Sequence, residues 1–138
     1  ALAVVGAPGY LAARGVPEAP ADLLAHDCVR YRFPSSGRIA PWRFQSPDGE
    51  YDVAISGGVI VNTLPASLDL ALRGLGLVYT FHDYCASACV DGALISVLHA
   101  DLPRTPGLYI YFPREYRTMT PLRLFIDHLS ARPKGAIA

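Results

Sequence analysis

Short apolar blocks alternate with polar, glycine-rich and proline-rich stretches along the chain, a pattern typical of alternating strands and helices. Residues 2–5 are wholly apolar, as expected for a strand buried on both faces. Pro8 suits the first turn of a short helix, and Gly15 suits its end. A second short helix is predicted at residues 20–25, and an aromatic-rich, alternating strand at residues 28–33.

The middle of the chain predicts a hairpin and a further strand. Residues 42–46 and 50–56 flank the turn sequence Pro-Asp-Gly, so they are expected to pair as antiparallel strands. A loop at residues 34–41 precedes this hairpin, and residues 58–61 predict another short strand.

A helix is expected to follow, ending at about Arg73. Asn62 and Thr63 are both good N-cap residues, and Pro65 fits a first helical turn. The buried stripe of this helix is predicted at four apolar positions with helical spacing, which are Leu64, Leu68, Ala71 and Leu72.

The remaining chain predicts a strand at 75–81, a helix at 82–90, and strands at 93–98 and 107–112. An amphipathic helix follows, with apolar residues at steps of three and four: Met119, Leu122, Phe125, Ile126 and Leu129. This order of elements predicts an α/β fold with a mixed sheet.

Gly74 and Gly76 stand beside an apolar strand and invite comparison with a nucleotide-binding turn. That fingerprint requires a strand, then G-x-G-x-x-G, then a helix. Here the helix comes first, and Tyr79 occupies the place of the third glycine. Gly74 is therefore expected to end the helix with a positive φ, and Gly76 to allow close packing.

Composition narrows the classes of function. The chain is 51% hydrophobic and 17% charged, enough for a buried core, and 12 basic residues balance 12 acidic ones. This balance argues against a nucleic-acid-binding surface. No apolar run approaches the roughly 20 residues needed to cross a bilayer. Reduced thiols in a cytosolic protein are the simplest interpretation of three cysteines without a framework of spacings.

Catalytic and metal chemistry find little support. His82, Cys85 and Cys89 have spacings of three and four that could serve zinc, with His26 or Cys28 as a fourth ligand. The alternative, that the cysteines are small buried side chains, is favoured. No G-x-S-x-G elbow and no close carboxylate pair is present, and no spacing supports a cysteine nucleophile. No catalytic residue, metal ligand or cofactor is predicted.

Two segments could bind a small polar ligand. Residues 30–38, RYRFPSSGR, place arginines and serines at the end of a strand, where α/β sheets often bind ligands and where an arginine fork would suit a carboxylate. Alternatively, the arginines are solvated on an ordinary two-faced strand. Residues 62–65, NTLP, present a helix N-terminus that could hold an anion, with plain capping as the alternative.

Several stretches together resemble the effector-binding (substrate-binding-like) domain of LysR-type transcriptional regulators. These stretches include PGYLAARGVPEAPADLLAHD, NTLPASLDLALRGLG and FIDHL, in the family's order and across nearly the whole chain. The resemblance implies an effector-sensing domain of a DNA-binding regulator, not an enzyme. A fragment of a solute-binding protein of the same fold is the alternative.

The resemblance also implies the organisation of the chain. The fold would be a lobe like those of type II periplasmic binding proteins, with a mixed sheet. Residues 6–105 would form the second lobe, while residues 1–5 and 106–132 would be crossover strands and the returning helix of the first lobe. The N-terminal helix-turn-helix domain, the only part expected to contact DNA, would lie outside residues 1–138. A cytoplasmic homo-oligomer without membrane contact is implied, and the apolar face of the last helix should promote self-association.

By the same resemblance, a small-molecule effector would bind in a cleft between the lobes, and a carboxylate is a candidate. The residues implied on this side of the cleft are Arg32, Phe33, Ser35, Ser36, Asn62, Thr63, Thr80 and Phe81. Many relatives have proline at the position of Phe81 and Asn-Asp at that of Asn62-Thr63, so the effector's identity does not carry over. The first-lobe half of the pocket would be absent, so this chain alone should bind weakly.

Overall fold

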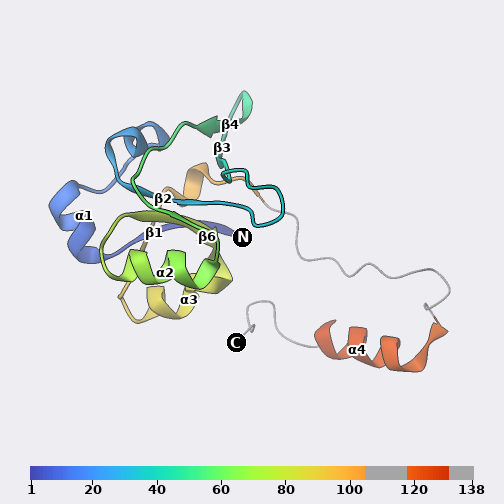
Figure 1. The fold of residues 1–138 in the computed structure, drawn as a ribbon. Helices are drawn as coiled ribbons and strands as arrows, with labels where there is room; N and C mark the ends of the chain where they lie inside the picture. The colour runs from blue at the N-terminus through green and yellow to red at the C-terminus, as the bar shows by residue number, and fades with distance from the viewer. Residues whose placement is uncertain (105–117, 131–138) are drawn as a thin grey trace. The chain divides into compact units, whose positions relative to one another are not determined.

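The computed structural model describes residues 1–104 and 118–130. The chain divides into two compact units, Ala1–Thr105 and Pro106–Ala138, and each is described by itself (Figure 1). The strand predicted at 107–112 lies outside the described residues.

The first unit is built on a five-stranded mixed sheet with the order β5-β2-β6-β1-β7. Its strands are β1 (Leu2–Gly6), β2 (Cys28–Tyr31), β5 (Ile60–Val61), β6 (Leu77–Phe81) and β7 (Ile95–Val97). Strand β2 runs parallel to both β5 and β6, whereas β1 runs antiparallel to β6 and β7. The mixed sheet predicted from the sequence is therefore confirmed.

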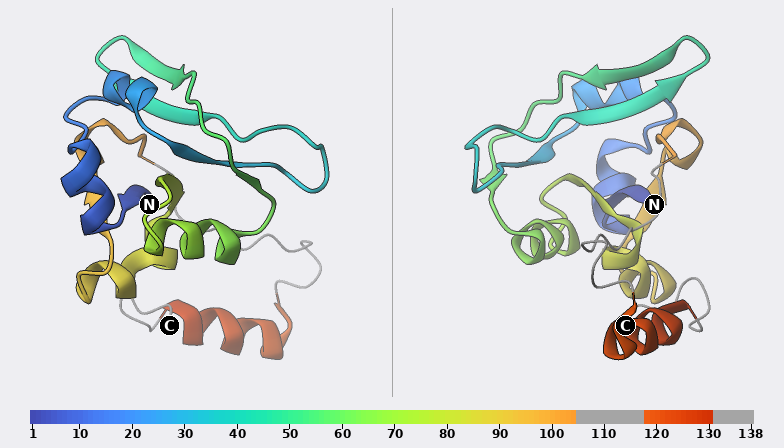
Figure 2. Two further views of the ribbon diagram at one scale, coloured as in Figure 1. Left: turned by 60° about the vertical axis from the view of Figure 1, so that its left-hand side comes forward. Right: turned by 90° about the vertical axis from the view of Figure 1, so that its right-hand side faces the viewer.

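Helices α2 (Leu64–Leu72) and α3 (His82–Val90) lie on one face of this sheet (Figures 1 and 2). The core between them and the sheet is formed by Ala3, Val5, Val29, Ala71, Val78, Cys85 and Leu94. Small residues face the sheet from both helices, with Ala71 in α2 and Cys85 in α3, and this allows the helices to approach the strands closely.

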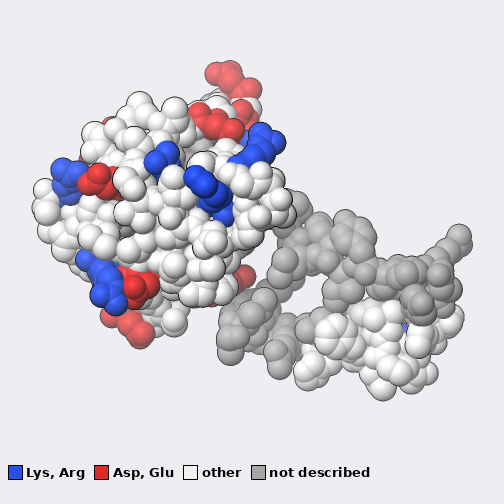
Figure 3. Space-filling view, viewed as in Figure 1, with Lys and Arg blue, Asp and Glu red and all other residues white. Residues whose placement is uncertain are grey.

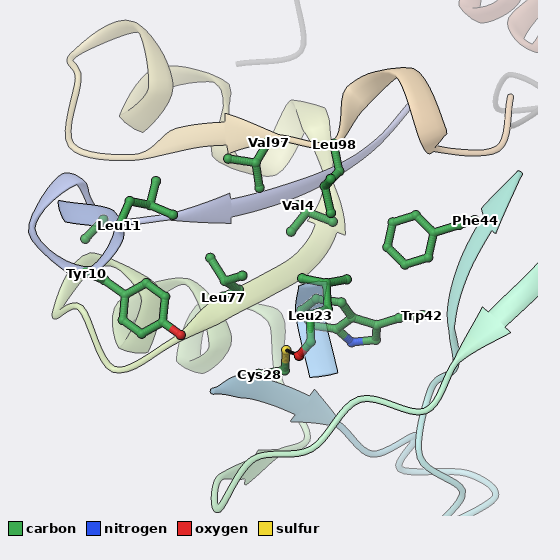
Figure 4. Packing of buried hydrophobic residues seen from close by; sticks show 11 residues of the cluster. Val4, Tyr10, Leu11, Leu23, Cys28, Trp42, Phe44, Leu77, Val97 and Leu98 are labelled. Atoms are coloured by element: carbon green, nitrogen blue, oxygen red, sulfur yellow. Dashed lines mark hydrogen bonds between the residues drawn. The ribbon is translucent and has the colours of Figure 1, made fainter. Parts of the chain in front are cut away.

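The opposite face is covered by helix α1 (Pro8–Arg14), the 3₁₀ helices η1 (Pro20–Ala25) and η2 (His99–Asp101), and a hairpin. The hairpin pairs β3 (Trp42–Ser46) with β4 (Gly49–Val53), as predicted. Trp42 and Phe44 are buried and alternate with exposed residues, so one side of the hairpin packs on the sheet. In Figure 4 their rings lie in one cluster with Leu23 and Leu77.

Tyr79 in β6 links the sheet to this hairpin. Its hydroxyl donates a hydrogen bond to the backbone carbonyl of Arg43 (2.9 Å), and its ring centroid lies 5.5 Å from that of Trp42. Burial raises the pKa of Tyr79 to about 12, so the hydroxyl keeps its proton at neutral pH.

Replacing Tyr79 by phenylalanine should lower the free energy of unfolding by about 1 kcal/mol, because the Arg43 carbonyl loses its donor while the ring stays in place. Urea denaturation measures the change. Tyr51→Phe is the matched control, because Tyr51 lies exposed on strand β4 of the hairpin. The stability of this variant should equal that of the unmodified chain. Equal stabilities for both variants would contradict the proposed link.

Several strands are shorter than predicted. Strand β2 ends at Tyr31 rather than at residue 33, because the N–H of Phe33 donates to the carbonyl of Arg38 (2.9 Å) and the chain turns back. Strand β5 spans only Ile60–Val61, and β7 only Ile95–Val97. A local turn ends β2, and β5 and β7 are the edge strands of the sheet. The pattern of apolar residues reveals neither feature.

The predicted buried stripe of α2 is wrong at Leu72. This side chain is 43% exposed, whereas Ser67 is only 3% exposed. The hydroxyl of Ser67 donates to the carbonyl of Leu64 (2.7 Å), which satisfies a buried polar group inside its own helix. A small serine can therefore take the position nearest the sheet.

The glycine prediction at the end of α2 is confirmed. Gly74 has φ 73°, and the N–H of Leu75 donates to the carbonyl of Leu70 (3.1 Å), closing the helix. At Gly76, an added Cβ would lie 2.5 Å from the carbonyl oxygen of Asp27. The missing side chain therefore lets the start of β6 approach the start of β2.

The described part of the second unit consists mainly of helix α4 (Thr120–Ser130), which confirms the predicted helix. Leu122 and Ile126 are partly buried, while Met119 and Phe125 are exposed. The side chain of Leu129 lies outside the described residues. Among the described helices, none is long and apolar enough to cross a membrane.

Candidate functional site

Three adjacent parallel strands, β5, β2 and β6, end at the same edge of the sheet. Asn62 follows β5, Arg32 follows β2, and Phe81 is the last residue of β6. Strand β1 runs the other way, so its first residue, Leu2, pairs with Phe81. The fold thus brings the three separate segments predicted for the site to one edge, near the N-terminus marked in Figure 1. We call this the carboxyl edge.

The loop after β2 is held by backbone hydrogen bonds. The N–H of Arg32 donates to the carbonyl of Val61 (2.7 Å), which ties the loop to the end of β5. The N–H of Gly37 donates to the carbonyl of Phe33 (2.8 Å) and closes a turn. Backbone groups thus fix the loop, while the side chains of Arg32, Phe33, Ser35 and Ser36 are exposed.

The predicted residues at the start of α2 have different environments. The side chain of Thr63 accepts a hydrogen bond from the N–H of Ala66 (3.4 Å), as an N-cap does. Plain capping therefore accounts for Thr63. Asn62 precedes the cap, and its side chain is exposed at the carboxyl edge.

At the end of β6, the two predicted residues point to opposite faces of the sheet. Thr80 is only 4% exposed and pairs with Ala3, so its side chain belongs to the interior. Phe81 is 53% exposed and presents an apolar ring at the edge. Seven of the eight predicted residues are therefore exposed, and Thr80 is the exception.

Three arginines at this edge have no acidic partner among the described residues, and the same is true of Arg104 and Arg123, which lie outside β2 and its loop. Within residues 1–104 and 118–130, the arginines that form ion pairs with aspartates or glutamates are Arg14, Arg43 and Arg73. In the same residues Arg30, Arg32 and Arg38, from β2 and the loop after it, form no such pair. Figure 3 shows both arrangements, with some blue groups beside red ones and others surrounded by white.

Arg30 lies in the segment predicted to bind a polar ligand, residues 30–38, but is not among the eight residues predicted for the cleft. Its Nε atom is buried and has no hydrogen-bond partner among the described residues. Arg30 lies in β2, and Arg32 directly follows this strand. The two residues are two positions apart in extended chain, so their side chains point to the same face. This alternation is visible in the sequence, but the burial of one guanidinium nitrogen is not. The arrangement favours an anion, because unpaired guanidinium groups bind carboxylates through charge-assisted hydrogen bonds.

A shallow depression lies at the opposite edge of the sheet, lined in part by Tyr10, Arg14, Asp27 and Leu75. Its polar groups are already paired. Arg14 forms an ion pair with Asp27, and the N–H of Asp27 donates to the hydroxyl of Tyr10 (2.9 Å). The depression therefore offers fewer free polar groups for a ligand than the carboxyl edge.

The two buried thiols, Cys28 and Cys85, show no sign of catalytic activation. Burial, and secondarily the charge of Asp27, raise the pKa of Cys28 to about 12, so little thiolate forms at neutral pH. Burial likewise raises the pKa of Cys85 to about 12. Within the described residues, no three His, Cys, Asp or Glu side chains are grouped to hold a metal ion.

The sequence matches the model of the LysR substrate binding domain family over residues 1–134. This match covers nearly the whole chain, which belongs to that family. The resemblance drawn from the sequence motifs is thereby confirmed.

Curated relatives agree with this assignment. A putative transcriptional regulator of Pseudomonas aeruginosa is 37% identical over 135 residues, covering 97% of this chain and 44% of that protein. The HTH-type transcriptional regulator PgrR of Escherichia coli is 33% identical, covering 99% of this chain and 45% of that protein. The chain thus spans less than half the length of these two relatives. YagP of E. coli, a putative LysR family substrate binding domain-containing protein, is 36% identical over 75% of this chain and 76% of its own length.

Solved structures support the fold. The regulatory domain of CrgA, a LysR-type regulator from Neisseria meningitidis, superposes with a TM-score of 0.71 at 24% identity, over 93% of this chain and 62% of that one. The regulatory domain of AphB from Vibrio vulnificus gives a TM-score of 0.68 at 21% identity, over 94% and 63%. The predicted fold class, an α/β lobe like those of type II periplasmic binding proteins, is confirmed.

Proposed function

We propose that this chain is the effector-sensing domain of a DNA-binding transcriptional regulator, and that its carboxyl edge binds an anionic small molecule. The observation that carries the ligand class is the set of arginines, Arg30, Arg32 and Arg38, without acidic partners among the described residues. The family and the names of the relatives support the regulatory role.

A carboxylate fits this edge best. The exposed guanidinium of Arg32 can donate two parallel hydrogen bonds to one carboxylate, and the hydroxyls of Ser35 and Ser36 add donors beside it. Phe33 and Phe81 are exposed and offer apolar surface to the rest of the ligand. A ligand with one anionic end and an apolar body would use both kinds of side chain.

We further propose the division suggested by the sequence, in which residues 6–105 form one lobe and the other lobe completes the cleft. Binding would then favour one arrangement of lobes over another by the difference in affinity. DNA would be contacted by a separate helix-turn-helix domain of a longer, cytoplasmic, homo-oligomeric protein. The alternative, a fragment of a solute-binding protein, predicts a secretory signal in the coding sequence before Ala1, whereas a regulator predicts a helix-turn-helix there.

The ligand proposal is tested by NMR titration of the chain with two pairs of compounds. Each pair is a carboxylate and the alcohol of the same carbon skeleton, namely benzoate with benzyl alcohol and propionate with propanol. The acids should shift the backbone amide signals of Ser35, Ser36 and Asn62, and the alcohols should not. NMR suits this test because it detects millimolar binding, which is the range expected for one side of a cleft.

Arg32→Ala should weaken carboxylate binding by about 10-fold or more, because a hydrogen bond to a charged group contributes about 1.5–3 kcal/mol. Arg73→Ala is the matched control, because Arg73 lies at the opposite edge and pairs with Asp69 (2.8 Å). Equal affinity of the Arg32→Ala variant and the unmodified chain, or equal shifts with acids and alcohols, would refute the proposed site.

A further inference from the structure

Helix α3 carries two thiols one turn apart. Cys85 and Cys89 occupy positions i and i+4, so they lie on the same side of the helix. Cys85 is 0% exposed and belongs to the core beneath the helix, and Cys89 packs against that core while remaining partly exposed. Both thiols are free. One sulfur of the pair is therefore accessible to solvent, and the other is buried.

The spacing of the pair suits a bridging ion better than a disulfide. Side chains at i and i+4 have Cβ atoms about 5–6 Å apart, whereas a disulfide needs about 3.5–4.5 Å. Direct oxidation would thus require α3 to distort. An ion bonded to both sulfurs, with metal–sulfur bonds of about 2.3 Å as for zinc, spans up to about 4.6 Å between them. The intact helix can hold two sulfurs at such a separation.

We propose that Cys85 and Cys89 form a two-thiolate site for one soft, thiophilic metal ion that accepts two-coordination, such as Hg(II) or Cu(I). On binding, two S–H bonds break, two metal–sulfur bonds form, the ion releases two of its water or chloride ligands and two protons pass to solvent, with no change of oxidation state. Soft thiolate ligands select ions of this class.

Zinc does not fit, because a structural zinc site takes four ligands and the described residues bring no third His, Cys, Asp or Glu to this pair. His82, the nearest candidate along the helix, lies 3.7 Å from the carboxylate of Asp83, and its side chain is largely exposed. The burial of Cys85 also disfavours its free thiolate, so only an ion with high affinity for sulfur displaces the proton.

The buried thiol has a direct link to the backbone at the start of α3. Its Sγ donates to the carbonyl of His82 (3.3 Å) and lies 3.8 Å from that of Phe81. A metal ion that replaces the thiol proton removes these hydrogen bonds. The metal site does not depend on the effector proposal, because neither sulfur belongs to the carboxyl edge residues.

The test uses one equivalent of HgCl₂ added to the reduced chain, followed by increasing 2-mercaptoethanol, with bound mercury measured by native mass spectrometry. The unmodified chain should retain one ion at thiol concentrations at least about 10²-fold higher than Cys89→Ser, because two linked donors bind far more tightly than one. Cys85→Ala should lose the ion as readily as Cys89→Ser. Cys28→Ala should behave like the unmodified chain.

Cys89 is partly exposed, so Cys89→Ser should fold normally, which circular dichroism verifies, and this variant decides the test even if Cys85→Ala fails to fold. Retention by Cys89→Ser equal to that of the unmodified chain would overturn the proposal. Loss of the ion from the unmodified chain at the same thiol concentration as from Cys89→Ser would overturn it equally.

Discussion

Replacing Phe44 by alanine should lower the free energy of unfolding of the first unit by about 3–5 kcal/mol. Phe44 is 0% exposed, and its ring centroid lies 6.0 Å from that of Tyr79 and 6.4 Å from that of Tyr51. Truncation removes a fully buried aromatic contact between the hairpin and the sheet and leaves a cavity. Urea denaturation followed by circular dichroism measures the loss.

Gln45→Ala is the matched control, because Gln45 is the next residue of the same strand and faces solvent. The free energy of unfolding of this variant should differ from that of the unmodified chain by less than about 0.5 kcal/mol. A loss below about 1 kcal/mol for Phe44→Ala would mean that the hairpin does not pack on the sheet in solution.

Replacing Gly76 by alanine should destabilise the chain by about 3 kcal/mol, through two effects that act together. The added Cβ would lie 2.5 Å from the carbonyl oxygen of Asp27, so either β6 or the start of β2 must move. The backbone of Gly76 also has φ 151°, which side-chain-bearing residues rarely adopt. The N–H of Leu77 donates to the same Asp27 carbonyl (2.8 Å), so this movement also strains a strand hydrogen bond.

The comparison variant is Gly9→Ala. Gly9 lies inside helix α1, and an added Cβ there meets nothing within 4 Å. Alanine should therefore leave stability unchanged or raise it by up to about 1 kcal/mol. Similar melting temperatures for Gly76→Ala and Gly9→Ala would show that the close approach at position 76 does not exist in solution.

Local sequence signals predicted most elements of the fold. The turn sequence Pro-Asp-Gly located the hairpin, and Gly74 located the end of α2, because these residues act through their own backbone preferences. These local signals failed where packing against other elements decides which residues are buried. Which side of α2 faces the sheet is set by the packing of whole elements, so Ser67 is buried and Leu72 is not.

The candidate site could be predicted only in pieces. The sequence indicated polar residues after 28–33 and at Asn62. No local sequence signal indicates that β5, β2 and β6 are parallel neighbours in the sheet. That order is a property of the chain topology and was not predicted, although the resemblance to a known family implied that the three segments lie on one side of a cleft. The unpaired Nε of Arg30 needed coordinates, since its burial depends on residues distant in sequence.

The two ends of the parallel strands differ in how freely they can change during evolution. At one end, Gly76 touches the backbone of Asp27, and almost any substitution there would be eliminated by selection for folding. At the other end, Arg32, Phe33 and Ser35 are exposed on a loop fixed by its own backbone. Substitutions at this loop should cost little stability, so under the proposed function a lineage could acquire a new effector without losing the scaffold. Libraries for engineered biosensors should therefore vary residues 32–36 and keep Gly76.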